Sequence, residues 1–261
     1  MIYDCFPFYN ELDLLELRFR ELQNVVDRHV VVQAEETHSG LDKPIYFNPE
    51  DPRWAPWADK IDTILLPKIT DPIDGAWTRE NATRKCLTSY LDRANSDDLV
   101  IISDVDEIPD ARLIAQYAPQ ATPKQWVGFK TPVSYFYLNL RAGRLFPCIG
   151  LARVETVRAK GAQGIRNWKK HPPIGPIEGG WHFSYIGSPE TIIGKLRAFA
   201  HTEYSDDRRV DLAYIAERIA KRENLFWPNE RKLTWVPIST LPQTVQANPE
   251  RYASWLLSEG A

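Results

Sequence analysis

The fold is indicated most clearly by the segment Asp98-Asp-Leu-Val-Ile-Ile-Ser103-Asp-Val-Asp-Glu-Ile-Pro109, in which an apolar run is followed by three acidic residues. Apolar runs are typical of strands that are covered on both faces, so we expect a strand over 98–103. Alternation along this strand would point the side chains of Asp104 and Asp106 the same way, about 6–7 Å apart. Such a pair holds a hard divalent cation, directly or through water. The alternative is a solvated acidic turn that caps the strand.

The residues before this segment predict an α/β fold. Hydrophobic spacing indicates strands at Ile2–Phe6, His29–Ala34 and Ile61–Pro67, and helices at Asn10–Val26, with Asn10 as the N-cap, and at Thr78–Ala94. Strands that alternate with helices favour a Rossmann-like, mostly parallel central sheet flanked by helices. Ligands bind such sheets beyond the carboxyl ends of the strands, where the acidic segment would lie.

After Pro109 the pattern changes to longer segments rich in β-branched and aromatic residues, which indicate a small antiparallel part. We expect a helix at Asp110–Tyr117, paired strands at Trp126–Leu140 and Leu145–Val157 joined near 141–144, a loop over the active site at 158–180, helices at Pro189–His201 and Val210–Glu223, a strand at Leu233–Ile238 and a helix at Pro249–Glu259.

Composition excludes several classes of protein. Lys and Arg total 32 against 35 Asp and Glu, and this net charge of −3 argues against broad binding to nucleic acid or anionic membranes. The three cysteines are far apart and odd in number, so we expect no disulfide framework and no cysteine-based zinc site. No secretory leader and no apolar stretch of roughly 20 residues is visible. These features predict a cytoplasmic protein without a membrane span.

Basic and acidic residues elsewhere are candidates for ligand binding. Arg79 and Arg84 fall in the first turns of the helix before the acidic segment, where a helix N-terminus favours anions such as a diphosphate. In Glu178-Gly-Gly-Trp-His-Phe-Ser184, His182 is a candidate third ligand for the cation. Glu178 is our candidate general base, with Asp206 and Asp207 next.

Four further residues are candidates for donor binding. Lys195 and His201 share a helix and would bind a phosphate, and Glu35 would bond a nucleoside from the end of its strand, as would Glu36.

Each of these candidates has a structural alternative. Arg84 pairs equally well with Glu80 four residues earlier on a helix surface, and His182 suits a hydrogen-bonded core position. The alternative for Glu178 and for the strand-end acids Glu35 and Glu36 is an ordinary solvated carboxylate. The alternative for Lys195 is an ordinary solvated helix face.

Five motifs in a fixed order resemble glycosyltransferase family 17: Asp4-Cys-Phe-Pro-Phe-Tyr-Asn-Glu11, Glu35, Trp77-x-Arg79-Glu80, Asp98 to Pro109, and Gly180-Trp-His-Phe-Ser-Tyr185. The resemblance covers roughly residues 2–205. It implies a GT-A fold, a nucleotide-sugar donor (UDP-GlcNAc in the animal member), a divalent metal, Mn²⁺ or Mg²⁺, and inversion at the anomeric carbon.

In this reading the chain is one domain, with a donor half at about 1–110, an acceptor side at about 111–205 and a helical extension at 206–261. Asp104, Asp106 and His182 would hold the metal, and a glycan would be the acceptor. Two alternatives from other classes stay open: a metal-dependent nucleotidyltransferase or phosphohydrolase, and a carbohydrate-binding protein without catalysis.

Overall fold

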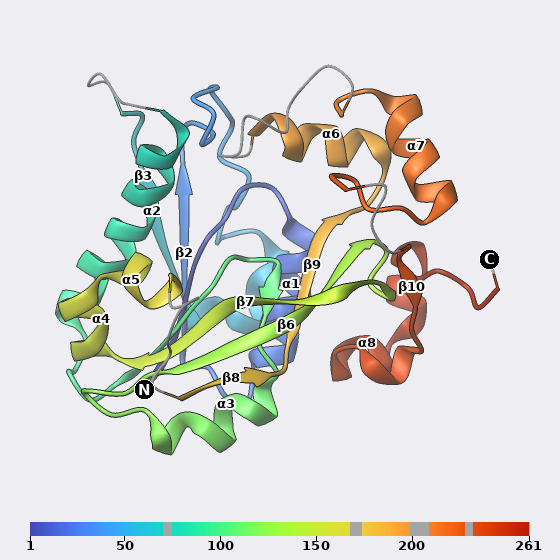
Figure 1. Cartoon of the computed structure of the whole chain (residues 1–261). Coiled ribbons are helices and arrows are strands. Elements are labelled where there is room, and N and C mark those ends of the chain that lie inside the picture. Colours follow the sequence, from blue (N-terminus) through green and yellow to red (C-terminus); the bar gives the residue numbers. More distant parts are fainter. Residues whose placement is uncertain (70–74, 168–173, 199–208, 228–231, 261) are drawn as a thin grey trace.

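The structure is a computed structural model that describes residues 1–69, 75–167, 174–198, 209–227 and 232–260, and a mixed sheet runs through it (Figure 1). Its strands are β1 (Ile2–Pro7), β2 (Arg28–Ala34), β3 (Ile61–Leu66), β4 (Leu99–Ile102), β5 (Glu107–Ile108), β6 (Val127–Phe136), β7 (Leu140–Arg153), β8 (Ile174–Glu178), β9 (Trp181–Ile186) and β10 (Thr234–Trp235). The strand order is β3-β2-β1-β4-β7-β6-β9-β5, with β10 beside β7 and β8 beside β6.

Helices cover both faces of this sheet (Figure 1). The α-helices are α1 (Leu12–Leu22), α2 (Ala76–Tyr90), α3 (Ala111–Tyr117), α4 (Val154–Lys160), α5 (Ala162–Arg166), α6 (Pro189–Ala198), α7 (Leu212–Lys221) and α8 (Gln243–Ala247). In the part of the chain that the structure describes, none of them has the length and apolar composition needed to cross a membrane.

The first half of the sheet is parallel. Strand β1 lies between β2 and β4, and β3 extends the sheet beyond β2. Cys5 of β1 packs in the cluster that contains Leu87 of α2, whereas its neighbour Phe6 packs in the cluster with Phe19 of α1. Both faces of the strands are therefore buried, as their apolar composition predicted.

The second half adds antiparallel strands, and the predicted α/β fold, with a mostly parallel central sheet and a smaller antiparallel part, is confirmed. Strand β7 runs antiparallel to both β4 and β6, while β9 is parallel to β6. The predicted joint at 141–144 is wrong, because these residues lie inside β7 and the turn comes earlier, at 137–139. Asn139 fixes that turn by accepting a hydrogen bond from the Leu257 backbone and donating one to its carbonyl.

The prediction of a loop at 158–180 is also wrong for its described residues. Helix α4 ends at Lys160, α5 follows directly, and β8 pairs with β6. Gly161, with a φ of 74°, separates the two short helices because such a backbone angle suits glycine. Ile165 of α5 is fully buried in the cluster that α2 and β4 share, which explains why this segment folds onto the sheet.

Several element ends also differ from prediction. Helix α1 begins after Glu11, so Asn10 is not its N-cap, and it ends at Leu22. Helix α2 ends at Tyr90 and continues as a short 3₁₀ turn, and the predicted helix from Pro249 is a 3₁₀ helix that ends at Trp255.

Candidate active site

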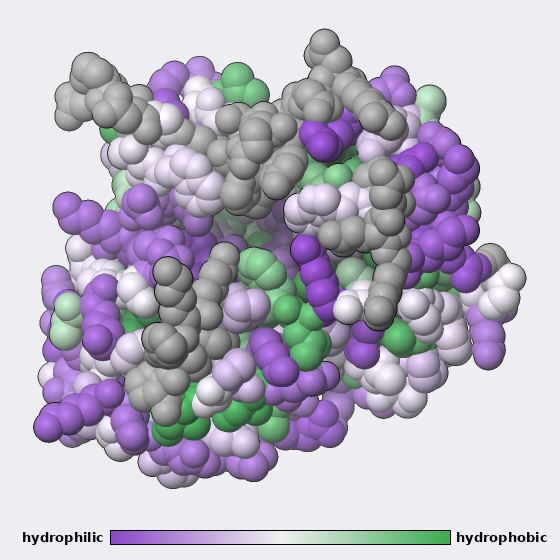
Figure 2. Space-filling view, in the orientation of Figure 1, coloured by the Kyte–Doolittle hydropathy of each residue, from purple (hydrophilic) through white to green (hydrophobic). Residues whose placement is uncertain are grey.

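A cleft of about 440 Å³ opens at the carboxyl ends of β1, β2 and β4, the edge at which open α/β sheets bind ligands. The space-filling view shows a hollow near the centre of the face that it presents (Figure 2). From the N-terminal half, the cleft is lined by Tyr9, Glu11, Glu36, His38, Lys43, Arg84, Asp104 and Asp106. From the C-terminal half, it is lined by Tyr135, Arg144, Arg166, His182, Tyr185, Lys195 and Trp227.

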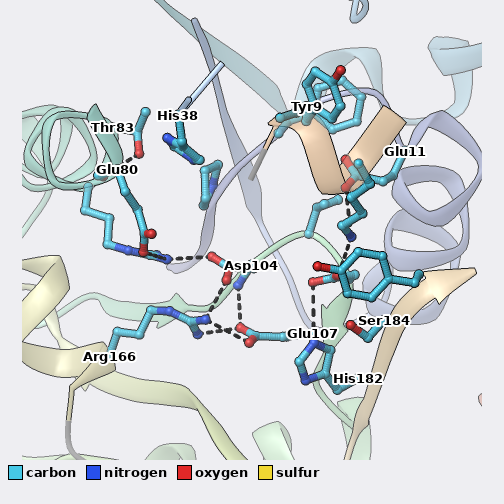
Figure 3. Close-up of a pocket in the computed structure, with 18 of the residues that line it drawn as sticks. Tyr9, Glu11, His38, Glu80, Thr83, Asp104, Glu107, Arg166, His182 and Ser184 are labelled. Carbon is cyan, nitrogen blue, oxygen red and sulfur yellow. Dashed lines mark hydrogen bonds and ion pairs between the residues drawn. The ribbon is translucent and has the colours of Figure 1, made fainter. Parts of the chain in front are cut away.

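The acidic segment enters this cleft as a turn and not as the end of a strand. Strand β4 stops at Ile102, and the amide of Glu107 donates a hydrogen bond to the carbonyl of Asp104 over 3.0 Å. The strand alternation predicted for Asp104 and Asp106 is therefore wrong, although both side chains do line the cleft. Each carboxylate has its own set of cationic partners (Figure 3).

Asp104 is held between two arginines. The Nη2 atom of Arg84 lies 2.7 Å from its Oδ1 and the Nη2 atom of Arg166 lies 2.5 Å from its Oδ2. Burial raises the pKa of Asp104, but Arg166 and Arg84 outweigh burial and hold it well below the ordinary value. Asp104 is therefore an ionised carboxylate whose two oxygens are both occupied.

Asp106 shares a lysine with a second acid. The Nζ atom of Lys195 in α6 lies 2.6 Å from Asp106 Oδ2 and 3.1 Å from Glu11 Oε1. Burial lowers the pKa of Lys195, but the two carboxylates outweigh burial and raise it. On the other side, His182 Nε2 lies 4.0 Å from Asp106 Oδ1.

The donor atoms beside Asp106 fit a divalent cation. Two ligands that each lie about 2.0–2.3 Å from one ion are separated by roughly 3–4.5 Å, and the 4.0 Å between Asp106 Oδ1 and His182 Nε2 falls in this range. Because Lys195 bonds Oδ2, Oδ1 stays available to an ion. Asp104 does not fit as a direct ligand in this arrangement, because arginines occupy both of its oxygens.

A second set of donor atoms lies deeper. Glu107, Cys148 and His182 each offer an atom, and these atoms lie within 4.8 Å of one another. A thiol must lose its proton to bind a metal, and burial raises the pKa of Cys148 well above the ordinary value. Arg166 also bonds both oxygens of Glu107. This set is therefore less suited to a cation than Asp106 with His182.

The predicted donor-binding residues divide between the cleft and its surroundings. Arg84 and Lys195 line the cleft. Arg79 does not belong to the lining, and it bonds Glu36, which does, over 3.0 Å. Glu35 is exposed and accepts a hydrogen bond from the backbone of residue 68, outside the cleft lining. His201, Asp206 and Asp207 lie outside the described residues.

The structure places Glu178, the predicted general base, away from Asp104 and Asp106. It lines a separate hollow of about 330 Å³ together with Arg141 and Gln243, and it is not part of the cleft lining. The turn after β8 separates it from His182. In this turn Gly180 has a φ of +85°, and a Cβ atom at this position would lie 2.6 Å from the carbonyl of Ile108. This geometry corrects the expectation that Glu178 shares the site.

Sequence reasoning missed Arg18 and Arg166. Arg18 lies on the apolar face of α1. Leu14 and Leu15 precede it by four and three residues, and Leu22 follows it by four. A charged residue on an apolar helix face could have identified Arg18, because a buried arginine needs a partner. Arg166 could not be found in this way, since its segment was interpreted as a loop.

The comparisons with known proteins point to similar relatives. Residues 1–119 match the sequence profile of glycosyltransferase family 17. Over 251 residues the chain is 27% identical to the β-1,4-mannosyl-glycoprotein 4-β-N-acetylglucosaminyltransferases of Rattus norvegicus and Mus musculus. Each alignment covers 80% of this chain and 45% of the relative, so the chain spans about half the length of these curated relatives.

Two solved structures are more distantly similar. Residues 1–349 of S. aureus TarS are 10% identical, with a TM-score of 0.37 over 84% of this chain and 72% of that chain. The glucosyl-3-phosphoglycerate synthase of Mycobacterium tuberculosis, solved with Mn²⁺, UDP-glucose and glycerol 3-phosphate, is 14% identical, with a TM-score of 0.29 over 51% of this chain and 44% of that chain. The sequence matches confirm the resemblance that the motifs predicted: the chain is similar to glycosyltransferase family 17 over residues 1–119 and to the two curated N-acetylglucosaminyltransferases over most of its length.

Proposed function

We propose that the cleft binds a nucleotide sugar with a divalent cation and transfers the sugar, with inversion, to a hydroxyl group of a glycan. UDP-GlcNAc is the first donor to test, because the curated relatives are named as N-acetylglucosaminyltransferases. The observation that carries the proposal is the acidic turn after β4. It lies at the ligand-binding edge of the sheet and presents Asp106 Oδ1, which accepts no hydrogen bond from any described residue, 4.0 Å from His182 Nε2.

The leaving diphosphate would lie beside Arg84 in this proposal. Arg84 is 1% exposed, and its Nε and Nη1 atoms have no hydrogen-bond partner among the described residues. A buried guanidinium with unused donors favours an anion. Such a fixed positive charge stabilises the negative charge that develops as the nucleoside diphosphate departs. A divalent cation, when bound, neutralises part of the same charge.

The acceptor enters from the other side of the reacting carbon. Its oxygen forms the new bond to the anomeric carbon as the bond to the phosphate oxygen breaks, and its proton passes to a carboxylate within hydrogen-bonding reach. Carboxylates that line the cleft are therefore the candidates for this role, whereas Glu178 lines a separate hollow. In this proposal residues 1–110 supply the donor half and residues 111–205 most of the acceptor side.

A ligand screen tests this function. UDP-, GDP- and dTDP-sugars would be added with and without Mn²⁺, because a ligand that binds only the folded state raises the Tm. Slow release of free sugar from one donor in the presence of Mn²⁺ supports the transferase. Release of a nucleoside monophosphate or inorganic phosphate indicates a nucleotidyltransferase or phosphohydrolase instead. Glycan binding that EDTA does not change indicates a carbohydrate-binding protein.

A further inference from the structure

Beneath the acidic turn lies a fully buried arginine to which the proposed function assigns no role. We propose that Arg18 is a positioning residue that sets the direction of the side chains of Asp104 and Asp106, through the backbone of residues 103–107. This inference rests on the proposed function, since it concerns how the same turn meets donor and cation.

The guanidinium of Arg18 holds the turn by its carbonyl groups. Its Nη1 atom donates to the carbonyl oxygens of Asp104 over 2.8 Å and Glu107 over 2.9 Å, with a longer 3.4 Å contact to Val105. Its Nη2 atom donates to Ser103 Oγ over 2.7 Å. One side chain therefore bonds four of the five residues from 103 to 107.

These contacts decide which way the turn faces. Because the carbonyls point inward to Arg18, the carboxylates of Asp104 and Asp106 are left to point outward, where they line the cleft. Val105 between them is buried and packs in the cluster that contains Phe6. The Asp106 carbonyl is fixed separately, by the amide of Phe183 in β9 over 2.8 Å. Rotating the turn would therefore break several buried hydrogen bonds at once.

Arg18 is itself held from the opposite side. Its Nε and Nη2 atoms donate to the two oxygens of Asp4 in β1, over 2.8 and 2.5 Å, and both side chains are fully buried. His29 Nδ1 lies 2.9 Å from the same carboxylate, and the guanidinium lies 4.4 Å from the centre of the Phe6 ring. Arg18 is thus anchored in the core by β1 and β2, two of the strands at whose carboxyl ends the cleft opens.

Two substitutions separate positioning from simple stability. Arg18→Lys keeps a positive charge beside Asp4, but one ammonium cannot bond both Asp4 oxygens and the carbonyls of the turn. Asp4→Asn weakens the buried pair on the side away from the turn and leaves the carbonyl contacts of Arg18 available. Arg20→Lys is the matched control, because Arg20 lies on the same helix, is 37% exposed and pairs with Glu16.

The test measures kcat and KM for the donor, the Tm, and hydrogen exchange of the amides of residues 103–107, at a temperature where every variant is folded. We expect Arg18→Lys to lower kcat/KM about 10- to 100-fold, mainly through kcat, since small misplacements cost this much. Exchange in the turn should rise in the same variant. Asp4→Asn should lower the Tm and leave kcat within about threefold, and Arg20→Lys should resemble the wild type.

The proposal is overturned if Arg18→Lys keeps the wild-type kcat and exchange rates. It is also overturned if Arg18→Lys and Asp4→Asn lose kcat in the same proportion to their loss of Tm. Should the lysine variant fail to fold, Asp4→Asn/Arg18→Met takes its place, because it removes both buried charges and keeps the volume. A wild-type protein that turns over no nucleotide sugar contradicts the proposed function alone, since exchange in the turn still tests the positioning.

Discussion

The substitution Arg166→Met should lower the stability of the fold, and the contacts of Arg166 indicate by how much. Arg166 donates to both oxygens of Glu107 over 2.5 and 2.8 Å, to Asp104 Oδ2 over 2.5 Å and to the Cys148 carbonyl over 2.7 Å. Because the Glu107 side chain is only 1% exposed, the substitution leaves a buried carboxylate without its cation. Breaking such a pair costs about 3–5 kcal/mol, which corresponds to a fall in Tm of roughly 6–20 °C for a chain of this size.

Thermal unfolding followed by circular dichroism measures this loss. Arg112→Met is the matched control, because Arg112 is 68% exposed and pairs with Asp110, and an exposed pair contributes about 0–1 kcal/mol. Adding Glu107→Gln to Arg166→Met should recover about 2 kcal/mol or more, since no uncompensated charge then remains. The reasoning is refuted if Arg166→Met costs no more than Arg112→Met, or if Glu107→Gln deepens the loss.

Three further predictions concern the site and its support. Asp106→Asn should lower donor consumption at least about 100-fold in a protein that stays folded, since Lys195 keeps Glu11 as a partner, and wild-type-like turnover of this variant after treatment with EDTA would contradict the metal mechanism. Glu178→Gln should keep turnover within about threefold, so a complete loss would restore Glu178 as the base. Burial raises the pKa of Asp4, but Arg18 and His29 outweigh burial and hold it at about 2, against an ordinary 3.8. The ionised form thus contributes about 2 kcal/mol of stability that is present above pH 3.8 and lost as the pH falls toward 2. Urea midpoints between pH 4 and 2 should fall more steeply for the wild type than for Asp4→Asn, and equal slopes would disprove this.

The parallel strands could be predicted from sequence because burial on both faces leaves its mark in composition. Strands β1, β2 and β4 are mostly apolar, and their predicted positions differ from the observed ones by a residue or two. The location of the acidic segment followed from the same reasoning. Its conformation did not, because a turn stabilised by Arg18 depends on a residue 86 positions away from Asp104.

The same dependence on distant partners explains the other errors. The turn before β7 is fixed by Asn139 bonding the backbone of residue 257, which no local pattern reveals. The segment with Gly161 and Lys160 has the composition of a loop, and it becomes helical because Ile165 fills the core beside α2. Glu178 stood close to His182 in sequence, but the tight turn at Gly180 directs the two into different hollows.

The central claim is that the acidic turn holds a cation against a nucleotide sugar. A crystal soaked with Mn²⁺ and UDP-GlcNAc, with anomalous diffraction measured at the manganese edge, tests it most directly. We expect a manganese peak between Asp106 and His182, with the diphosphate beside Arg84. A donor bound in the cleft with no peak there, or a peak at Glu107 and Cys148 instead, would contradict it.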